Sequence, residues 1–285
     1  MSKTPPKHGI LVGVDGTQSA VNAARWAAFV ARRLKEPLRL VHVDSGGGRN
    51  GDPETERDTT DVVLGAAEAA VREIAGDVTV ESDTRSGSPA KTLTELSESA
   101  RMVVLGHTTT TEWQSMFGRS DVVYISNHAA CPVVSWRSEH GFRPPDGREI
   151  VLGVDGSNLS KAAIAHGYEI ASLLEAPLVA VHTWMEQSTL TYGEGSRFTD
   201  WTAYAEHKKA DMVESMAGLS ERYPDVRVIH KVERGKPDIV LLEHSSDAQL
   251  VVVGSHGRSA LASAVLGSTS QGLIHHAMCP VMVCR

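Results

Sequence analysis

The strongest constraint on the fold of this chain is an internal repeat. Three residues of the first half return at an offset of 140: Asp15 as Asp155, Pro37 as Pro177 and His42 as His182. Later residues return at an offset of 148: Gly106 as Gly254, Cys131 as Cys279 and Pro132 as Pro280. The second copy is therefore longer by eight residues, inserted between His182 and Gly235. Both copies must share one architecture.

The repeat also divides the chain. Each copy has the length of one ordinary domain. We expect a short tail at residues 1–8, a first domain at 9–137, a polar linker rich in proline and glycine at 138–148, and a second domain at 149–285.

Short apolar runs alternate with helical patterns in both copies. The predicted strands are 10–14, 38–43, 78–84, 102–105 and 132–135, then 150–154, 178–183, 226–232, 250–253 and 280–283. Strands that are apolar on both faces and alternate with helices are typical of a covered parallel sheet. The sequence predicts an α/β fold of two tandem doubly wound domains. Each has a five-stranded parallel sheet in the order 3-2-1-4-5, with helices on both faces.

Ligands of such sheets bind at the carboxyl ends of the strands, where the strand order reverses. In the second copy, Gly254, Gly257, Gly267 and Ser268 follow the fourth strand with the spacing G-2x-G-9x-G-S. Glycines allow close approach of the backbone, and a helix N-terminus offers N–H groups to an anion. Turn glycines and a capping serine are also needed in any α/β domain, but their combined spacing favours a phosphate site.

This spacing resembles the motif of the universal stress protein family. Asp-Gly-Ser/Thr after the first strand, Val-His in the second, Gly-x-Pro after the third and Cys-Pro-Val entering the fifth extend the resemblance over nearly the whole chain. The resemblance implies an ATP site, often with Mg²⁺, in the second copy. The implied residues are Gly153, Asp155, Thr183, Gly254, Ser255, His256, Gly257, Arg258, Gly267, Ser268 and Thr269. Asp155 and Thr183 would border the adenine and ribose, and the segments 254–258 and 267–269 would hold the phosphates.

The first copy departs from this motif. Thr109 and Arg119 replace the second and third glycines, Ser120 keeps the serine, and Asp121 replaces Thr269. An acidic residue in the first helical turn stabilises the helix dipole and repels phosphate. Arg119 could instead contact an anion. The matching first-half positions are Gly13, Asp15, Val43, Gly106, Arg119 and Ser120.

Several other polar residues have an ordinary structural interpretation. Asp15 and Asp155 can cap the following helix as well as face a ligand. His42 and His182 lie within apolar strands, which favours a hydrogen-bonded histidine over a catalytic base. His275, His276 and Cys279 lack an evident fourth ligand, so we expect no metal site there. His256 either touches phosphate or is simply an exposed loop residue.

Composition limits the function classes. The net charge of −7 argues against nucleic acid as a partner, and no apolar run reaches the length of a membrane span. Three cysteines without a CxxC motif, and a start without the apolar core of a secretory signal, indicate the cytoplasm.

The sequence shows neither a GxxxxGK[ST] loop nor a nucleophile–base pair of recognisable spacing. The leading hypothesis is therefore a cytoplasmic ATP-binding sensor or regulator of the stress response, and not an enzyme. Its output would be binding of a regulatory protein partner, and two chains would form a homodimer. The family resemblance further implies that the two domains pair through residues 132–135 and 280–283. The alternatives are an interaction scaffold with a structural nucleotide or none, and a slow ATPase.

Overall fold

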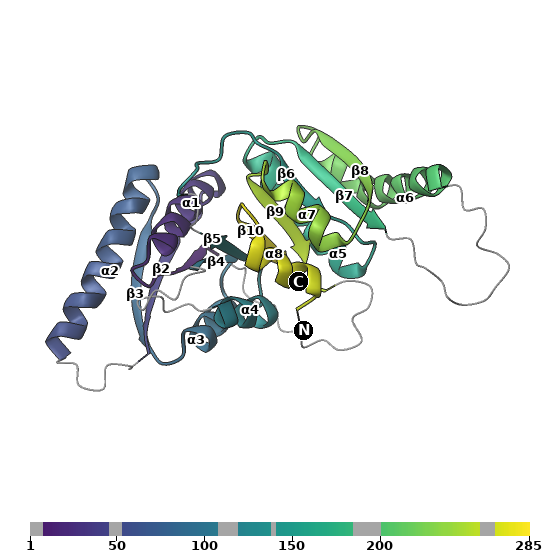
Figure 1. Ribbon diagram of the computed structural model, residues 1–285. Helices are drawn as coiled ribbons and strands as arrows, with labels where there is room; N and C mark the ends of the chain where they lie inside the picture. Colours follow the sequence, from purple (N-terminus) through teal and green to yellow (C-terminus); the bar gives the residue numbers. More distant parts are fainter. Residues whose placement is uncertain (1–7, 46–52, 108–118, 138–140, 185–200, 257–265) are drawn as a thin grey trace, which may run out of the picture.

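All described strands belong to one ten-stranded sheet. The computed structural model describes residues 8–45, 53–107, 119–137, 141–184, 201–256 and 266–285. The strand order is β3-β2-β1-β4-β5-β10-β9-β6-β7-β8 (Figure 1). The strands of the first half are β1 (Ile10–Gly13), β2 (Leu38–Asp44), β3 (Val80–Ser86), β4 (Met102–His107) and β5 (Val133–Arg137). Those of the second half are β6 (Ile150–Gly153), β7 (Leu178–Trp184), β8 (Val228–Arg234), β9 (Leu250–Gly254) and β10 (Val281–Cys284).

Within each half the strands are parallel and follow the order 3-2-1-4-5. This confirms the predicted fold class. The observed bounds differ slightly from the predicted ones at several strand ends. The fifth strands begin at Val133 and Val281, one residue after a proline, because proline has no N–H to donate to a ladder.

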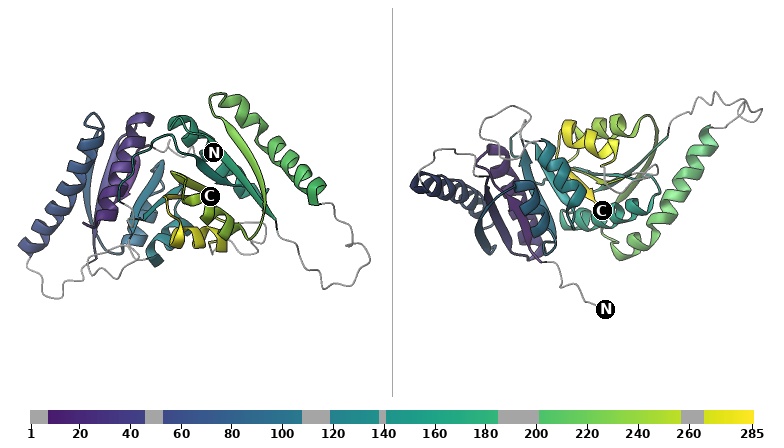
Figure 2. Two further views of the ribbon diagram at one scale, coloured as in Figure 1. Left: turned by 45° about the horizontal axis from the view of Figure 1, so that its top comes forward. Right: turned by 90° about the horizontal axis from the view of Figure 1, so that it is seen from below.

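Helices cover both faces of the sheet. The first half contributes α1 (Gln18–Leu34), α2 (Pro53–Ile74), α3 (Pro89–Leu96) and α4 (Arg119–His128), and the second contributes α5 (Asn158–Leu173), α6 (Trp201–Arg222), α7 (Pro237–Ser245) and α8 (Ser268–His276). One core joins the sheet to α1, α2, α5 and α6, and the other joins it to α3, α4, α7 and α8. Figure 2 shows α2 and α6 at opposite ends of the molecule.

Consecutive strand residues enter different cores. Leu11 belongs to the core under α3 and α4, whereas Val12 belongs to the core under α1. Alternate residues of a strand point to opposite faces of the sheet, and helices cover both faces. Both side chains are therefore buried. This double burial explains why the strands are continuous apolar runs in the sequence.

The two halves join through an antiparallel pair of strands. Val134 of β5 lies opposite Met282 of β10, and Ser135 lies opposite Val281. The pairing of the fifth strands implied by the family resemblance is thus confirmed. It removes two exposed sheet edges, which would otherwise be sites for aggregation. None of the described helices is both long and apolar enough to cross a bilayer.

Candidate functional site

The predicted site of the second half lies at the carboxyl edge of its sheet. Gly153 ends β6, Thr183 lies near the end of β7, and Gly254 ends β9. Helix α8 begins beside them at Ser268. Because β6 pairs with both β7 and β9, the fold brings these segments together at the switch in strand order.

Hydrogen bonds fix the start of α8 against the end of β9. The Ser270 hydroxyl donates to the carbonyl of Gly254 at 2.7 Å. The N–H of Gly267 donates to the carbonyl of Ser255 at 2.8 Å, and the N–H of Ser255 donates to Cys284 at 2.7 Å. The segment before the helix is therefore anchored to both β9 and β10.

The first turn of α8 suits an anion. Gly267 is the N-cap residue and contributes no side-chain hydrogen bond to this turn. Ser268 is exposed, Thr269 is half-buried, and no acidic residue occupies the turn. Since the first N–H groups of a helix have no intrahelical acceptor, this turn offers donors and the positive end of a dipole.

Asp155 follows β6 at this edge of the sheet and is half-buried. Its Oδ1 accepts from the N–H of Ser157 at 2.9 Å and from the hydroxyl of Ser160 at 2.8 Å. Ser157, and not Asp155, is the N-cap residue of α5. In the first half, Asp15 likewise accepts from the N–H of the N-cap residue, Thr17, at 3.0 Å. The capping role considered for the two aspartates is wrong, because each orients the capping residue instead.

Two histidines of the second half have defined partners. His182 Nδ1 lies 2.8 Å from the carbonyl of Val154, which supports the structural interpretation of this residue. His256 Nδ1 lies 3.0 Å from Ser255 Oγ. The Nε2 atom of His256 is shielded from solvent and has no hydrogen-bond partner among the described residues. The predicted residues Gly257 and Arg258 lie outside the described part of the chain.

The first half places the matching residues in a more closed environment. Asp15 is 7% exposed, and Gly13, Val43 and Gly106 are buried. A Cβ atom on Gly106 would overlap the backbone of Ser19 at the start of α1. Glycine is therefore required there by close packing of the helix on β4, whether or not a ligand binds.

The start of α4 also differs from the start of α8. Arg119 begins the helix, Ser120 is exposed, and Asp121 occupies the first turn. His107, at the position of Ser255, is 1% exposed and fills space at the end of β4. The sequence analysis assigned no role to His107, although the offset of 148 residues aligns it with Ser255 of the predicted site.

The histidines and cysteine considered as a metal site are spread over α8 and the turn after it. The rings of His275 and His276 are edge to face with centroids 6.1 Å apart. Cys279 is buried, and burial raises the pKa of its thiol to about 12. Among the described residues, no three His, Cys, Asp or Glu side chains are grouped as metal ligands would be.

Comparisons with known proteins agree with this architecture. The model of the universal stress protein family matches residues 8–137 and 147–285. The chain is 33% identical over 296 residues to a universal stress protein of Mycolicibacterium smegmatis, covering 100% of this chain and 99% of that protein. It is 34% identical over 301 residues to a universal stress protein of Mycobacterium tuberculosis H37Rv, with the same coverage.

A solved structure shows the same fold over the whole chain. The crystal structure of a universal stress protein from Archaeoglobus fulgidus matches with a TM-score of 0.69 at 15% identity, covering 98% of this chain and 97% of that one. The chain is a doubly wound α/β protein built from two similar halves. It belongs to the universal stress protein family and carries two copies of the family's fold in tandem.

Proposed function

We propose that the second half binds ATP, with Mg²⁺ when it is present, and that the bound nucleotide makes the chain a sensor or regulator in the stress response. The observation that carries this proposal is the first turn of α8. It has no acidic side chain and no capping side chain, and it is anchored beside Gly254 at the switch point of the sheet.

The residues at this edge fit a nucleotide. The α8 turn, with the hydroxyls of Ser268 and Thr269, would hold phosphate oxygens. The Nε2 of His256, which has no hydrogen-bond partner in the described part of the chain, is a further polar atom that a ligand could satisfy. Asp155 and Thr183, both half-buried at this edge, would border the ribose and adenine. When bound, ATP supplies binding energy that favours one conformation or assembly over another, as far as its affinities for the two states differ.

The first half does not fit the same ligand equally well. Asp121 adds a negative charge to the turn where phosphate would lie. Asp15 and Gly106 are also more buried than their counterparts Asp155 and Gly254. We therefore propose that the first half acts mainly as a scaffold for the second.

A slow ATPase is the second candidate, because Ser255 and His256 form a hydroxyl–imidazole pair at 3.0 Å. However, Ser255 is 1% exposed, so its Oγ is poorly placed to attack a bound phosphate. We propose instead that this pair shapes the loop. We also propose that the protein is not an enzyme. An interaction scaffold with a structural nucleotide, or with none, is the third candidate.

We also propose a cellular compartment and an oligomeric state for this protein. All three cysteines are free thiols in buried positions, which is typical of a reducing compartment such as the cytoplasm. The proposed assembly is a homodimer that binds a regulatory protein.

The direct test is the nucleotide content of the purified protein. After denaturation, chromatography of the supernatant should yield about one adenine nucleotide per chain, and added Mg-ATP should raise the melting temperature of nucleotide-free protein. Two nucleotides per chain would restore the first half as a binding site. No nucleotide together with no thermal shift would leave the scaffold hypothesis. Phosphate release well above that of a Gly267→Asp control would support the ATPase.

A further inference from the structure

Three residues at the start of α5 form a closed ring of hydrogen bonds around Asp155. Ser157 Oγ accepts from the N–H of Ser160 at 3.2 Å, and Asp155 Oδ1 accepts from the N–H of Ser157 at 2.9 Å. Ser160 closes the ring, because its Oγ donates to Asp155 Oδ1 at 2.8 Å and accepts from the N–H of Asp155 at 3.0 Å. Ser160 therefore holds both the backbone and the carboxylate of Asp155.

The first half holds its aspartate in a different way. Ala20 replaces Ser160 at the offset of 140 residues, so the helix offers no hydroxyl at this position. The hydroxyl of Thr17, which caps α1, instead donates to Asp15 Oδ1 at 2.6 Å. Asp15 is thus turned onto the capping residue and is 7% exposed, whereas Asp155, held by Ser160, stays half-buried at the sheet edge.

The loop after β6 is also more open than the loop after β1. A Cβ atom added to Gly16 would lie 3.0 Å from Cγ2 of Val63, a residue of α2. A Cβ atom added to Gly156 would have no described atom within 4 Å, apart from its chain neighbours. Asp155 is therefore fixed by Ser160 and lies beside an open loop, at the edge where we propose a nucleotide.

A fixed carboxylate suits the recognition of one particular donor. An ionised carboxylate accepts hydrogen bonds and donates none, so Asp155 favours a ligand group that carries an O–H or N–H. A hydrogen bond to a charged group is stronger than one between neutral groups, but part of the gain is lost when the side chain must first be ordered. Ser160 orders the carboxylate of Asp155 before any ligand arrives.

We propose that Ser160 is a positioning residue of the nucleotide site, which orients the Asp155 carboxylate to accept a hydrogen bond from the nucleoside of the ligand. This inference rests on the proposed binding of ATP to the second half. The donor is either a ribose hydroxyl or the 6-amino group of adenine. Ser160 is 4% exposed and acts through Asp155, without touching the ligand itself.

The affinities of two ATP analogues test the proposal. The first, 2′,3′-dideoxy-ATP, lacks the ribose hydroxyls, and the second, purine riboside triphosphate, lacks the 6-amino group. In titration calorimetry the unmodified chain should bind ATP at least about tenfold more tightly than one of these analogues. In Ser160→Ala, which copies Ala20, ATP should bind about five- to tenfold more weakly, and its preference over that analogue should fall below about threefold. Ser160→Thr keeps the hydroxyl and should retain both the affinity and the preference.

Ser172→Ala is the matched control. Ser172 lies in the last turn of the same helix, and its hydroxyl also donates to a carboxylate oxygen, Asp225 Oδ2, at 2.7 Å. Its loss should leave the affinity for ATP within about twofold. Amide hydrogen exchange gives a second measurement without any ligand. The N–H of Asp155 loses its acceptor in Ser160→Ala and should exchange about fivefold faster, but its exchange should not change in Ser172→Ala.

The outcomes separate this role from the proposed function. If the unmodified chain binds no ATP, the proposed function fails and the role of Ser160 fails with it. If ATP binds, three results overturn the role of Ser160 alone: equal affinity for ATP and both analogues in the unmodified chain, an unchanged preference in Ser160→Ala, or unchanged exchange of the Asp155 N–H. An affinity that falls equally for ATP and both analogues would show that Ser160 stabilises the start of α5 without orienting Asp155.

Discussion

Arg137 donates a hydrogen bond from Nη1 to the backbone carbonyl of His275 at 2.6 Å. The contact is reciprocal, because Arg285 makes the same bond to Asn127, and the residues of one pair match those of the other at an offset of 148. Each arginine thus reaches a carbonyl in the last turn of the opposite helix, where the helix dipole is negative. These two bonds reinforce the seam formed by β5 and β10.

Loss of either arginine should weaken the seam. Arg137→Met and Arg285→Met should each lower the free energy of unfolding by about 1 kcal/mol, since each removes a charged donor from a backbone carbonyl. Urea denaturation measures the change. Arg72→Met is the matched control, because Arg72 forms an exposed i,i+4 ion pair with Glu68, and the loss of that pair should cost at most about 0.5 kcal/mol. An equal loss in Arg72→Met would contradict a special role for the seam arginines.

Gly106 should tolerate no side chain. Gly106→Ala places a Cβ against the backbone of Ser19 and Ala20, so α1 must move away from β4. We expect a loss of about 2–3 kcal/mol in the free energy of unfolding. Gly65→Ala is the control, since Gly65 lies within α2 and, apart from the helix itself, no described atom lies within 4 Å of the added Cβ. That variant should be more stable by about 0.5–1 kcal/mol. Equal effects in the two variants would show that the packing at Gly106 is not tight.

The candidate nucleotide sites of the two halves should respond differently to an added negative charge. Gly267→Asp and Thr269→Asp should each remove most ATP binding, because a carboxylate then occupies the α8 turn proposed for phosphate. Arg119→Asp should remove less. Titration calorimetry with Mg-ATP measures each affinity and the number of sites.

The reverse exchange gives the complementary test. Asp121→Thr gives the α4 turn the residue type of the second half, and should raise the number of ATP molecules bound per chain if Asp121 is the main obstacle. Equal losses in Arg119→Asp and Gly267→Asp would show that both halves bind ATP.

Stability should depend on pH through Glu169, which joins α5 to the first half. Its carboxylate pairs with Arg101 and lies 3.5 Å from His166, while Arg101 also lies 3.6 Å from Glu36. The hydrogen bond from His166 lowers the pKa of Glu169 below its ordinary 4.5, with burial opposing and Arg101 adding to the shift. A lowered pKa stabilises the fold above pH 4.5, and this contribution disappears as the pH falls through the folded-state value.

A double-mutant cycle isolates the part of this contribution that comes from Arg101. The coupling between Arg101→Met and Glu169→Gln, obtained from unfolding free energies, should be favourable at pH 6 and decline steadily toward pH 2.5. A coupling that grows as the pH falls would contradict the assignment.

The sequence predicted the parts of the fold that depend on local pattern. Runs such as Ile10–Gly13 and Leu250–Gly254 are apolar on both faces, so they could be recognised as buried parallel strands. The repeat then supplied each element twice. The pairing of β5 with β10 came from the family resemblance, because nothing in the runs around Val134 and Met282 distinguishes a partner strand.

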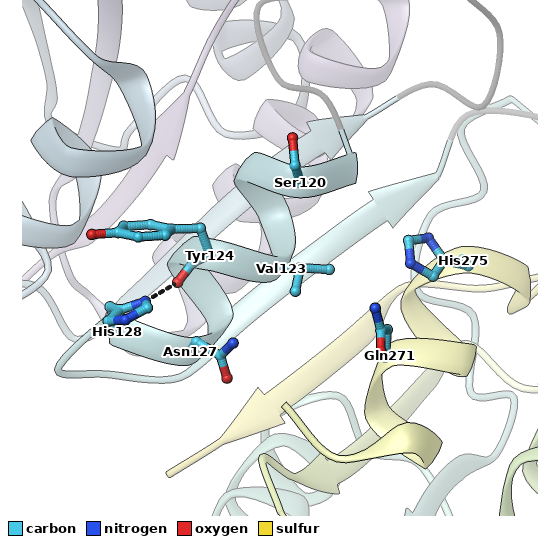
Figure 3. Close-up of a pocket in the computed structure, with 7 residues that line it drawn as sticks. All are labelled: Ser120, Val123, Tyr124, Asn127, His128, Gln271 and His275. Carbon is cyan, nitrogen blue, oxygen red and sulfur yellow. Dashed lines mark hydrogen bonds between the residues drawn. The ribbon is translucent and has the colours of Figure 1, made fainter. Parts of the chain in front are cut away.

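Other features depend on packing between distant segments and left no signal in the sequence. Arg137 and His275 are 138 residues apart, and neither belongs to a motif. Helices α4 and α8 meet (Figure 3) only because β5 pairs with β10. Helix α1 is capped by Thr17 and not by Asp15, two residues earlier, and the sequence does not distinguish them because both side chains suit an N-cap.

The antiparallel pair of β5 and β10 has a consequence for how this protein can evolve. In an assembly of two identical chains, each substitution appears on both sides of the symmetry axis. Here the strands that join the halves belong to a single polypeptide, so a change such as aspartate at position 121 arises once and leaves Thr269 untouched. One half can lose a ligand while it continues to support its neighbour, and the two can diverge without separating.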